Sequence, residues 1–278
     1  TIVSFATTLP EMLVSVFAAL QGNADIAVGN AVGSVTANVG LIMCVALICM
    51  ECAMTRKQFG VKACLLLAAI LALFGFTRDG QLSVLESVLI LVIFVGFLVE
   101  SLIAARQEQG SELPAQEERP KIDRKTVLLN IGKFLLGAAG IVLGAQLLID
   151  NGSALARMLG VPDAVIAATM IAIGTSLPEL VTTLTAIKKK QASLSVGNII
   201  GANIMDLTLI MPLCAVIQGK PMTVERQGML LDIPACLIIC AAALIPALVQ
   251  GKFKRWIGYL IGGLYIAYLI IMFTCFGA

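Results

Sequence analysis

The sequence contains no histidine, and only 13% of its 278 residues are charged, against roughly 25% in an average soluble domain. Without histidine the chain cannot form a His-based zinc or haem site, or the HExxH motif of metalloproteases. No GxGD string occurs either. The sequence therefore predicts a protein that is not an enzyme.

Charge and cysteine give no sign of a nucleic-acid or redox partner. The formal net charge is only +2, so nothing indicates nucleic acid binding. The eight cysteines lie mostly inside apolar runs, and no CxxC pair lies in a loop. We therefore expect the cysteines to be small apolar residues of the core. We also expect no bound cofactor and no protein partner.

Long apolar runs make up most of the chain, which is 59% hydrophobic. Runs such as 82–103 and 233–249 approach the roughly 20 residues that a membrane-spanning helix needs. The sequence therefore predicts an all-α integral membrane protein, with the lipid bilayer as its surroundings. The expected segments lie at about 1–20, 25–50, 60–77, 81–105, 126–149, 162–187, 192–217, 228–250 and 255–276.

One hydrophilic stretch, RQEQGSELPAQEERPKIDRK at 106–125, interrupts these segments. It is charged, contains two prolines and has few apolar residues, which is typical of a flexible linker. The sequence thus divides into a first half at 1–105 with four helices, the linker, and a second half at 126–278 with five helices.

The two halves repeat each other when one is shifted by 168 positions. TIVSFATTLPE then aligns with TMIAIGTSLPE, and VGNAVGSVTAN aligns with VGNIIGANIMD without a gap. Residues 1–38 and 169–206 share eleven identities in this register. Internal duplication of this kind is typical of transporters whose binding site lies at the repeat interface.

The repeat also predicts a helix that precedes this chain. Residues 126–168 have no counterpart in the first half, so we expect one helix to be missing upstream of Thr1. The whole would then be two five-helix halves. Because five is odd, the halves would enter the membrane in opposite senses, as a ten-helix inverted repeat.

Basic residues predict the orientation. With the linker placed in the cytoplasm, alternating the segments puts fifteen Lys and Arg on the cytoplasmic side and four outside, the positive-inside pattern. This predicts a multi-pass protein of the cell (inner) membrane with its C-terminus outside. The four outside residues are Arg78, Arg157, Lys220 and Arg226.

Polar residues within the apolar segments occupy equivalent positions in the two halves. A Thr precedes a Glu by four residues in each half, so both face one side of a helix. The first half offers Thr7, Thr8, Glu11, Ser34 and Asn38, and the second offers Thr175, Ser176, Glu179 and Asp206, with Ala202 at the position of Ser34. These polar faces can converge if the halves pack against each other.

Proline and glycine add to the pattern. Pro10 and Pro178 lack an N–H, so the carbonyls four residues earlier, at Ala6 and Gly174, are expected to lose their helical partners and to be available to cations. Paired glycines allow close approach of helices. These are Gly29, Gly33, Gly197 and Gly201.

The oxygen ligands in this set favour hard cations. Carboxylate, hydroxyl, amide and carbonyl oxygens suit Ca²⁺, Na⁺, Mg²⁺ and Mn²⁺ rather than soft metals. Three ionised carboxylates carry a charge of −3, which three Na⁺ would balance and one Ca²⁺ would reduce to −1. The alternative is that these residues only hydrogen-bond neighbouring helices, and for Ser34 that packing role is nearly as strong an interpretation.

The strings TTLPE…VGNAVGS…N and GTSLPE…VGNIIGAN…D resemble the two α-repeats of the cation/calcium exchanger superfamily, in particular its prokaryotic sodium/calcium exchangers. The resemblance covers almost the whole chain, from the second helix of the family to the tenth. It implies a ten-helix inverted-repeat antiporter with four ion sites clustered at mid-membrane. The family's first helix, which helps to form a mobile gate, would be the one missing here.

The resemblance also implies a role for each site residue. The calcium ligands of the family correspond to Glu11, Glu179, Thr7 and Thr175. Its sodium ligands add Thr8, Ser34, Ser176 and the backbone carbonyls of Ser4 and Ala172. Its central site corresponds to Asn38 and Asp206 with the two Glu.

Two positions depart from the family pattern, which often has Ser at Thr8 and usually has Ser at Ala202. The second change removes a hydroxyl ligand, so sodium affinity could differ or a proton could replace one sodium. We expect a secondary active antiporter that exchanges Ca²⁺ for Na⁺ by alternating access. Exchange of Ca²⁺ or another cation for H⁺ is the alternative, and a cation channel or a non-transporting sensor is a third possibility.

Overall fold

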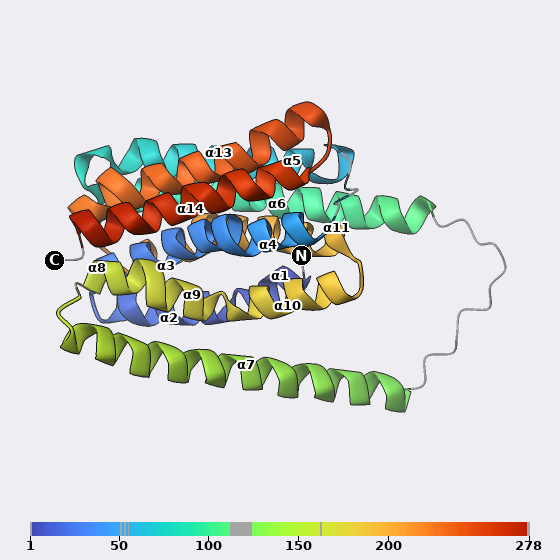
Figure 1. The fold of residues 1–278 in the computed structure, drawn as a ribbon, viewed down its shortest axis with the longest axis horizontal. Coiled ribbons are helices and arrows are strands. Elements are labelled where there is room, and N and C mark those ends of the chain that lie inside the picture. Colours follow the sequence, from blue (N-terminus) through green and yellow to red (C-terminus); the bar gives the residue numbers. More distant parts are fainter. Residues whose placement is uncertain are drawn as a thin grey trace.

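The computed structural model describes residues 2–50, 52, 54, 56–111, 124–161 and 163–276, and within them the chain is almost entirely helical (Figure 1). Each of the nine predicted apolar segments is helical there. By length and composition, six described helices can cross a membrane, or seven if the bent pair Ala168–Thr175 and Leu177–Lys188 is one span. The predicted all-α membrane fold is therefore confirmed, and the ten-helix inverted repeat stays a prediction.

The first half contains α1 (Ile2–Thr7), α2 (Leu9–Leu20), α3 (Ala24–Ala37), the π-helical turn η1 (Asn38–Met43), α4 (Cys44–Cys49), α5 (Arg56–Phe76), the 3₁₀ turn η2 (Thr77–Asp79), β1 (Gln81–Leu82) and α6 (Val84–Ser111). The second half contains α7 (Arg124–Met158), α8 (Asp163–Ile166), the π-helical turn η3 (Ala167–Ile171), α9 (Ala172–Thr175), α10 (Leu177–Lys188), α11 (Ala192–Met205), the π-helical turn η4 (Asp206–Ile210), α12 (Met211–Gln218), β2 (Met222–Thr223), the π-helical turn η5 (Gly228–Asp232), α13 (Ile233–Gln250) and α14 (Arg255–Cys275).

The linker predicted at 106–125 is shorter than expected at both ends. Helix α6 continues to Ser111, and α7 already begins at Arg124. Charged side chains at the end of a long helix can remain in water, so the polarity that suggested a linker does not end the helix. The stretch 112–123 lies outside the described residues, so its predicted flexibility stays a prediction.

The helices form layers (Figure 1). Helices α5, α6, α13 and α14 lie on one side of a central layer made by α3–α4 and α11–α12, and the broken helices α1–α2 and α9–α10 lie on its other side. Helix α7 flanks α9 and α10. The central layer is the most buried part of the bundle, so polar side chains on α3 and α11 lie deep in the protein.

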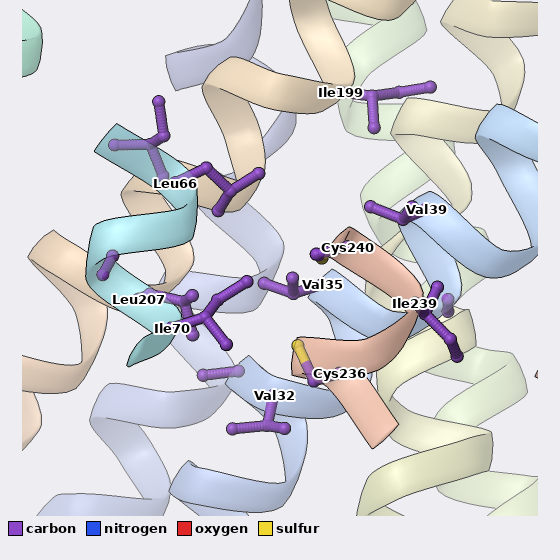
Figure 2. Packing of buried hydrophobic residues seen from close by; sticks show 14 of the residues in the cluster. Val32, Val35, Val39, Leu66, Ile70, Ile199, Leu207, Cys236, Ile239 and Cys240 are labelled. Atoms are coloured by element: carbon purple, nitrogen blue, oxygen red, sulfur yellow. The ribbon is translucent and has the colours of Figure 1, made fainter. Parts of the chain in front are cut away.

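Apolar side chains from many elements fill the space between the central layer and its neighbours (Figure 2). Burial of this surface is the main stabilising contribution to the contact between elements far apart in the sequence. The cluster includes Val32 and Val35 of α3, Leu66 and Ile70 of α5, Ile199 of α11, Leu207 of η4, and Cys236, Ile239 and Cys240 of α13.

The loops gather at the two ends of the bundle. At one end the guanidinium of Arg56 donates to the carbonyl of Val249 at 2.7 Å, and the backbones of Cys52 and Phe253 pair in an isolated antiparallel β-bridge. At the other end β1 pairs antiparallel with β2. The α10–α11 and α13–α14 connections lie at the first end and the C-terminus at the second (Figure 1).

Candidate functional site

Both halves contain a helix that breaks at a proline. Helix α1 ends and α2 begins around Thr8, and α9 ends and α10 begins around Ser176, with a bend of 51° in the second pair. Pro10 and Pro178 each occupy the second position of the new helix, where a missing N–H costs least. The breaks therefore lie where the prolines predicted them, beside the two Thr–Glu pairs.

Hydroxyl groups gather on two equivalent backbone carbonyls at these breaks. The carbonyl of Ser4 accepts from the N–H of Thr8 at 2.9 Å, from its hydroxyl at 2.6 Å and from the hydroxyl of Thr7 at 3.2 Å. The carbonyl of Ala172 accepts from the N–H of Ser176 at 3.1 Å and from the hydroxyl of Thr175 at 3.2 Å. Each break thus concentrates several oxygens within a few ångströms.

The two central helices change geometry at equivalent residues. The helix of α3 widens into the π-helical turn η1 at Asn38, and α11 widens into η4 at Asp206. These residues are 168 positions apart, the spacing of the repeat. Short π-helical turns are rare and are frequent at functional sites, and both begin here at a predicted ligand.

Close helix crossings bring these elements together across the halves. A Cβ added at Gly33 of α3 would lie 2.8 Å from the Cβ of Ala172 and 2.9 Å from the carbonyl oxygen of Ala168. A Cβ added at Gly201 of α11 would lie 2.6 Å from the hydroxyl oxygen of Ser4. Each central helix thus packs through glycine against the broken helix of the opposite half.

Three carboxylates lie at this junction. Glu11 is 1% exposed, and Glu179 and Asp206 are 0% exposed. They lie close enough to one another to interact electrostatically. Five of their six oxygens have no hydrogen-bond partner, because only one oxygen of Glu11 is engaged.

No basic side chain lies on the helices that carry this junction, apart from one at an end. Within the described residues, α2, α3 and α11 contain no Lys or Arg, and α10 has only Lys188 in its last turn. Buried carboxylates without a partner are expensive in a low-dielectric interior. The arrangement is therefore suited to receive cations rather than to form internal ion pairs.

One hydrogen bond joins the halves directly at the carboxylates. The hydroxyl of Ser176 donates to Oε1 of Glu11 at 3.2 Å. Thr7 of the first half lies near Glu179 of the second. Glu11 and Glu179 thus each lie beside a hydroxyl of the opposite half, so the polar faces of the two broken helices meet.

A compact group of oxygens surrounds Ser34. Its hydroxyl oxygen is 3.3 Å from that of Thr175 and 3.4 Å from the carbonyl oxygen of Ala172. At the equivalent place in the second half stands Ala202, which is completely buried and offers no oxygen. The two equivalent positions of the repeat therefore differ by one hydroxyl.

Three buried asparagines also belong to the junction, although the sequence analysis did not single them out. Asn30 accepts from Thr175 at 3.2 Å and donates to the carbonyl of Glu11 at 3.2 Å. Its counterpart Asn198 accepts from the hydroxyl of Ser4 at its backbone carbonyl. Asn30 and Asn198 are the asparagines of the two VGN strings, which are identical in the two halves, so the repeat contained the signal for them. Asn203 has Val35 as its counterpart, so the repeat contained no signal for it.

Among the residues that the structure describes, no group of three or more His, Cys, Asp and Glu side chains is arranged to hold a metal ion. A cation at the junction would therefore need hydroxyl, amide and carbonyl oxygens in addition to carboxylates. The Thr, Ser and Asn residues described above provide such oxygens.

Comparison with known proteins identifies a single family. The family model described as sodium/calcium exchanger protein matches residues 1–103 and 129–274. The inner membrane protein YrbG of Escherichia coli K12 is 30% identical over 98% of this chain and 85% of its own. The sodium/calcium exchanger MaX1 of Methanosarcina acetivorans is 28% identical over 98% of this chain and 87% of its own.

A solved structure has the same fold. The sodium-calcium exchanger NCX_Mj, soaked with 10 mM Na⁺ and 10 mM Sr²⁺, superposes with a TM-score of 0.76 at 27% sequence identity. The match covers 97% of this chain and 84% of that one. The likeness includes both halves, and therefore the junction between them.

Proposed function

We propose that this chain, which belongs to the sodium/calcium exchanger protein family, exchanges Ca²⁺ for Na⁺ across the cell membrane by alternating access. The family is one of transporters. The observation that carries the proposal is the set of three buried carboxylates with five unpartnered oxygens at the junction of the two repeated halves.

The proposed ion ligands come from both halves of the chain. Mixed hydroxyl, carbonyl and carboxylate oxygens are the ligands that Ca²⁺ prefers in proteins. Glu11, Glu179, Thr7 and Thr175 would bind Ca²⁺, and Na⁺ would add Thr8, Ser34, Ser176 and the carbonyls of Ser4 and Ala172. A central site would be formed by Asn38 and Asp206 with the two Glu, which it shares with the Ca²⁺ ligands.

Charge explains why one ion would replace the other. If ionised, the three carboxylates repel one another, and the protein leaves this repulsion uncompensated. One Ca²⁺ or up to three Na⁺ neutralise most of it, but both loads together would reverse the charge. Because the ions share Glu11 and Glu179, binding of one excludes the other.

The burial of the carboxylates supports alternating access. With exposures of 1% or less for all three, ions reach the site only when helices move. The breaks at Thr8 and Ser176 are the positions where the bordering helices can bend with least loss of backbone hydrogen bonds.

A cation/H⁺ exchange is the second candidate, and Ala202 is the observation that favours it. The hydroxyl absent there leaves one fewer oxygen for Na⁺, and a proton needs no such ligand. Uptake of ⁴⁵Ca²⁺ by proteoliposomes of the full-length protein, under either an imposed Na⁺ gradient or an imposed pH gradient, separates the two. Uptake that follows only the pH gradient would replace Na⁺ by H⁺ in the proposal.

We expect Glu179→Gln to abolish ⁴⁵Ca²⁺ uptake driven by a Na⁺ gradient, because the site loses a shared charged ligand. The matched control is Glu100→Gln, which removes a carboxylate that pairs with Lys62 at 3.6 Å away from the junction. Both side chains of this pair are only about one-fifth exposed, but neither belongs to the candidate site, so flux should persist. Retained flux in Glu179→Gln would contradict the assignment.

A further inference from the structure

Asn203 makes one specific contact at the junction. Its side-chain oxygen Oδ1 accepts a hydrogen bond from Nδ2 of Asn38 at 2.9 Å. Both side chains are 0% exposed. Asn203 does not donate in return, since its Nδ2 has no partner, and Oδ1 of Asn38 also has none. The contact therefore holds the amide NH₂ group of Asn38 in place.

An amide differs from a carboxylate in that its two ends are not equivalent. Its oxygen can bind a cation, whereas its NH₂ group repels one. An asparagine that rotates by half a turn about its last bond would present the wrong end. With its NH₂ held by Asn203, Asn38 keeps Oδ1 available as an oxygen ligand.

The equivalent pair in the repeat, Asp206 and Val35, makes no such contact. The counterpart of Asn38 is Asp206, whose two oxygens are equivalent and both unpartnered. The counterpart of Asn203 is Val35, which is completely buried and belongs to the apolar cluster (Figure 2). The elements pack equivalently, α11 against η1 and α3 against η4. The amide thus has an orienting partner, and the carboxylate has none and needs none.

We propose that Asn203 is a positioning residue, which orients the amide of Asn38 so that its oxygen faces the transported cation. The proposal rests on the proposed function, because it takes Asn38 as an ion ligand. It makes no claim that Asn203 itself touches the ion.

The test is a double-mutant cycle in the full-length protein. Asn203→Val removes the acceptor, and the equivalent position of the repeat already holds a valine, Val35. Asn38→Asp replaces the amide by a carboxylate, which needs no orientation. We expect Asn203→Val to weaken equilibrium ⁴⁵Ca²⁺ binding about tenfold beside Asn38, and less than about twofold beside the substituted Asp, as expected for one buried hydrogen bond.

A purely structural role for Asn203 predicts a different pattern. Loss of packing would weaken binding by the same factor in both backgrounds, and that result would overturn the proposal. Asn203→Thr provides the matched control, since Thr has nearly the shape of Val but retains an oxygen that can accept from Asn38. It should bind Ca²⁺ more tightly than Asn203→Val beside Asn38 only, and equal affinities there would also count against the proposal.

Flux separates this inference from the proposed function. In proteoliposomes, Asn203→Val should raise the KM for Ca²⁺ while the maximal rate changes by less than about twofold, since binding rather than movement is affected. A wild-type protein that binds Ca²⁺ but does not exchange it would contradict the proposed function, and the binding cycle would still decide the role of Asn203.

Discussion

The carboxylates of the junction are buried without basic partners, as a cation transport site of the proposed kind requires. A Lys or Arg beside Glu11, Glu179 or Asp206 would stabilise the fold but would compete with every cation that enters. The hydroxyls that replace such a partner are neutral. They solvate an ion without adding charge, so the occupancy of the site depends on the ions in solution.

The two equivalent positions that are proposed to bind sodium differ by one hydroxyl, which mutation can remove from one and add to the other. We expect Ser34→Ala to raise the Na⁺ concentration needed for half-maximal Ca²⁺ efflux about three- to tenfold, the effect of one lost oxygen ligand. Ala202→Ser restores a hydroxyl and should lower that concentration. The measurement is the Na⁺ dependence of ⁴⁵Ca²⁺ efflux from proteoliposomes.

Thr36→Val is the control for this pair. The Thr36 hydroxyl is buried on the same helix as Ser34 but donates to the carbonyl of Val32 in its own helix at 2.7 Å. Its loss should leave the Na⁺ dependence unchanged. An equal shift in Thr36→Val and Ser34→Ala would mean that Ser34 acts only through helix packing.

At the scale of elements, the site depends on helices that depart from regular geometry. Two helices break at proline, and two widen into π-helical turns at Asn38 and Asp206. Each departure frees or redirects backbone groups that a regular helix would use internally. The departures occur in matched pairs, so the site is built twice from the same local features.

Glycine determines how closely these elements approach. We expect Gly33→Ala to destabilise the protein by about 1–3 kcal/mol, because its Cβ would lie 2.9 Å from a backbone carbonyl. Gly75→Ala on α5 has nothing within 4 Å of its Cβ, and should be neutral or slightly stabilising. Thermal unfolding in detergent and Na⁺-driven flux measure both effects. Equal stability of the two variants would contradict the close crossing.

At the scale of the whole molecule, the loops and basic residues gather at two distinct ends. The connections after α10 and α13 lie at the same end (Figure 1) and carry clusters of Lys and Arg. Under the positive-inside pattern this end would face the cytoplasm. The end with the β1–β2 pair and the C-terminus would then face outward.

Orientation can be tested by thiol labelling. With exposed Cys49, Cys64 and Cys275 replaced by Ser, we expect Lys220→Cys to react with a membrane-impermeant reagent in intact cells. Lys252→Cys should react only in inverted vesicles, because it lies at the opposite end. The reverse labelling pattern would invert the proposed topology.

The sequence by itself determined the fold class and the positions of the helical segments, and it predicted most of the residues of the candidate site. Apolar runs reveal membrane helices because a bilayer requires every backbone group to be satisfied within a segment. Duplication then identified Glu11, Glu179, Asn38 and Asp206 as equivalent pairs, since two copies of one motif repeat the same local chemistry.

Only the tertiary structure decided which side chains meet across the halves. The contact between Asn203 and Asn38 depends on packing between segments that are 165 residues apart in the sequence. The π-helical turns and the continuation of α6 to Ser111 also became visible only in the structure. Asn203 shows the reason most clearly. Its counterpart is Val35, so duplication conceals it, and its role follows from a neighbour that no local pattern in the chain specifies.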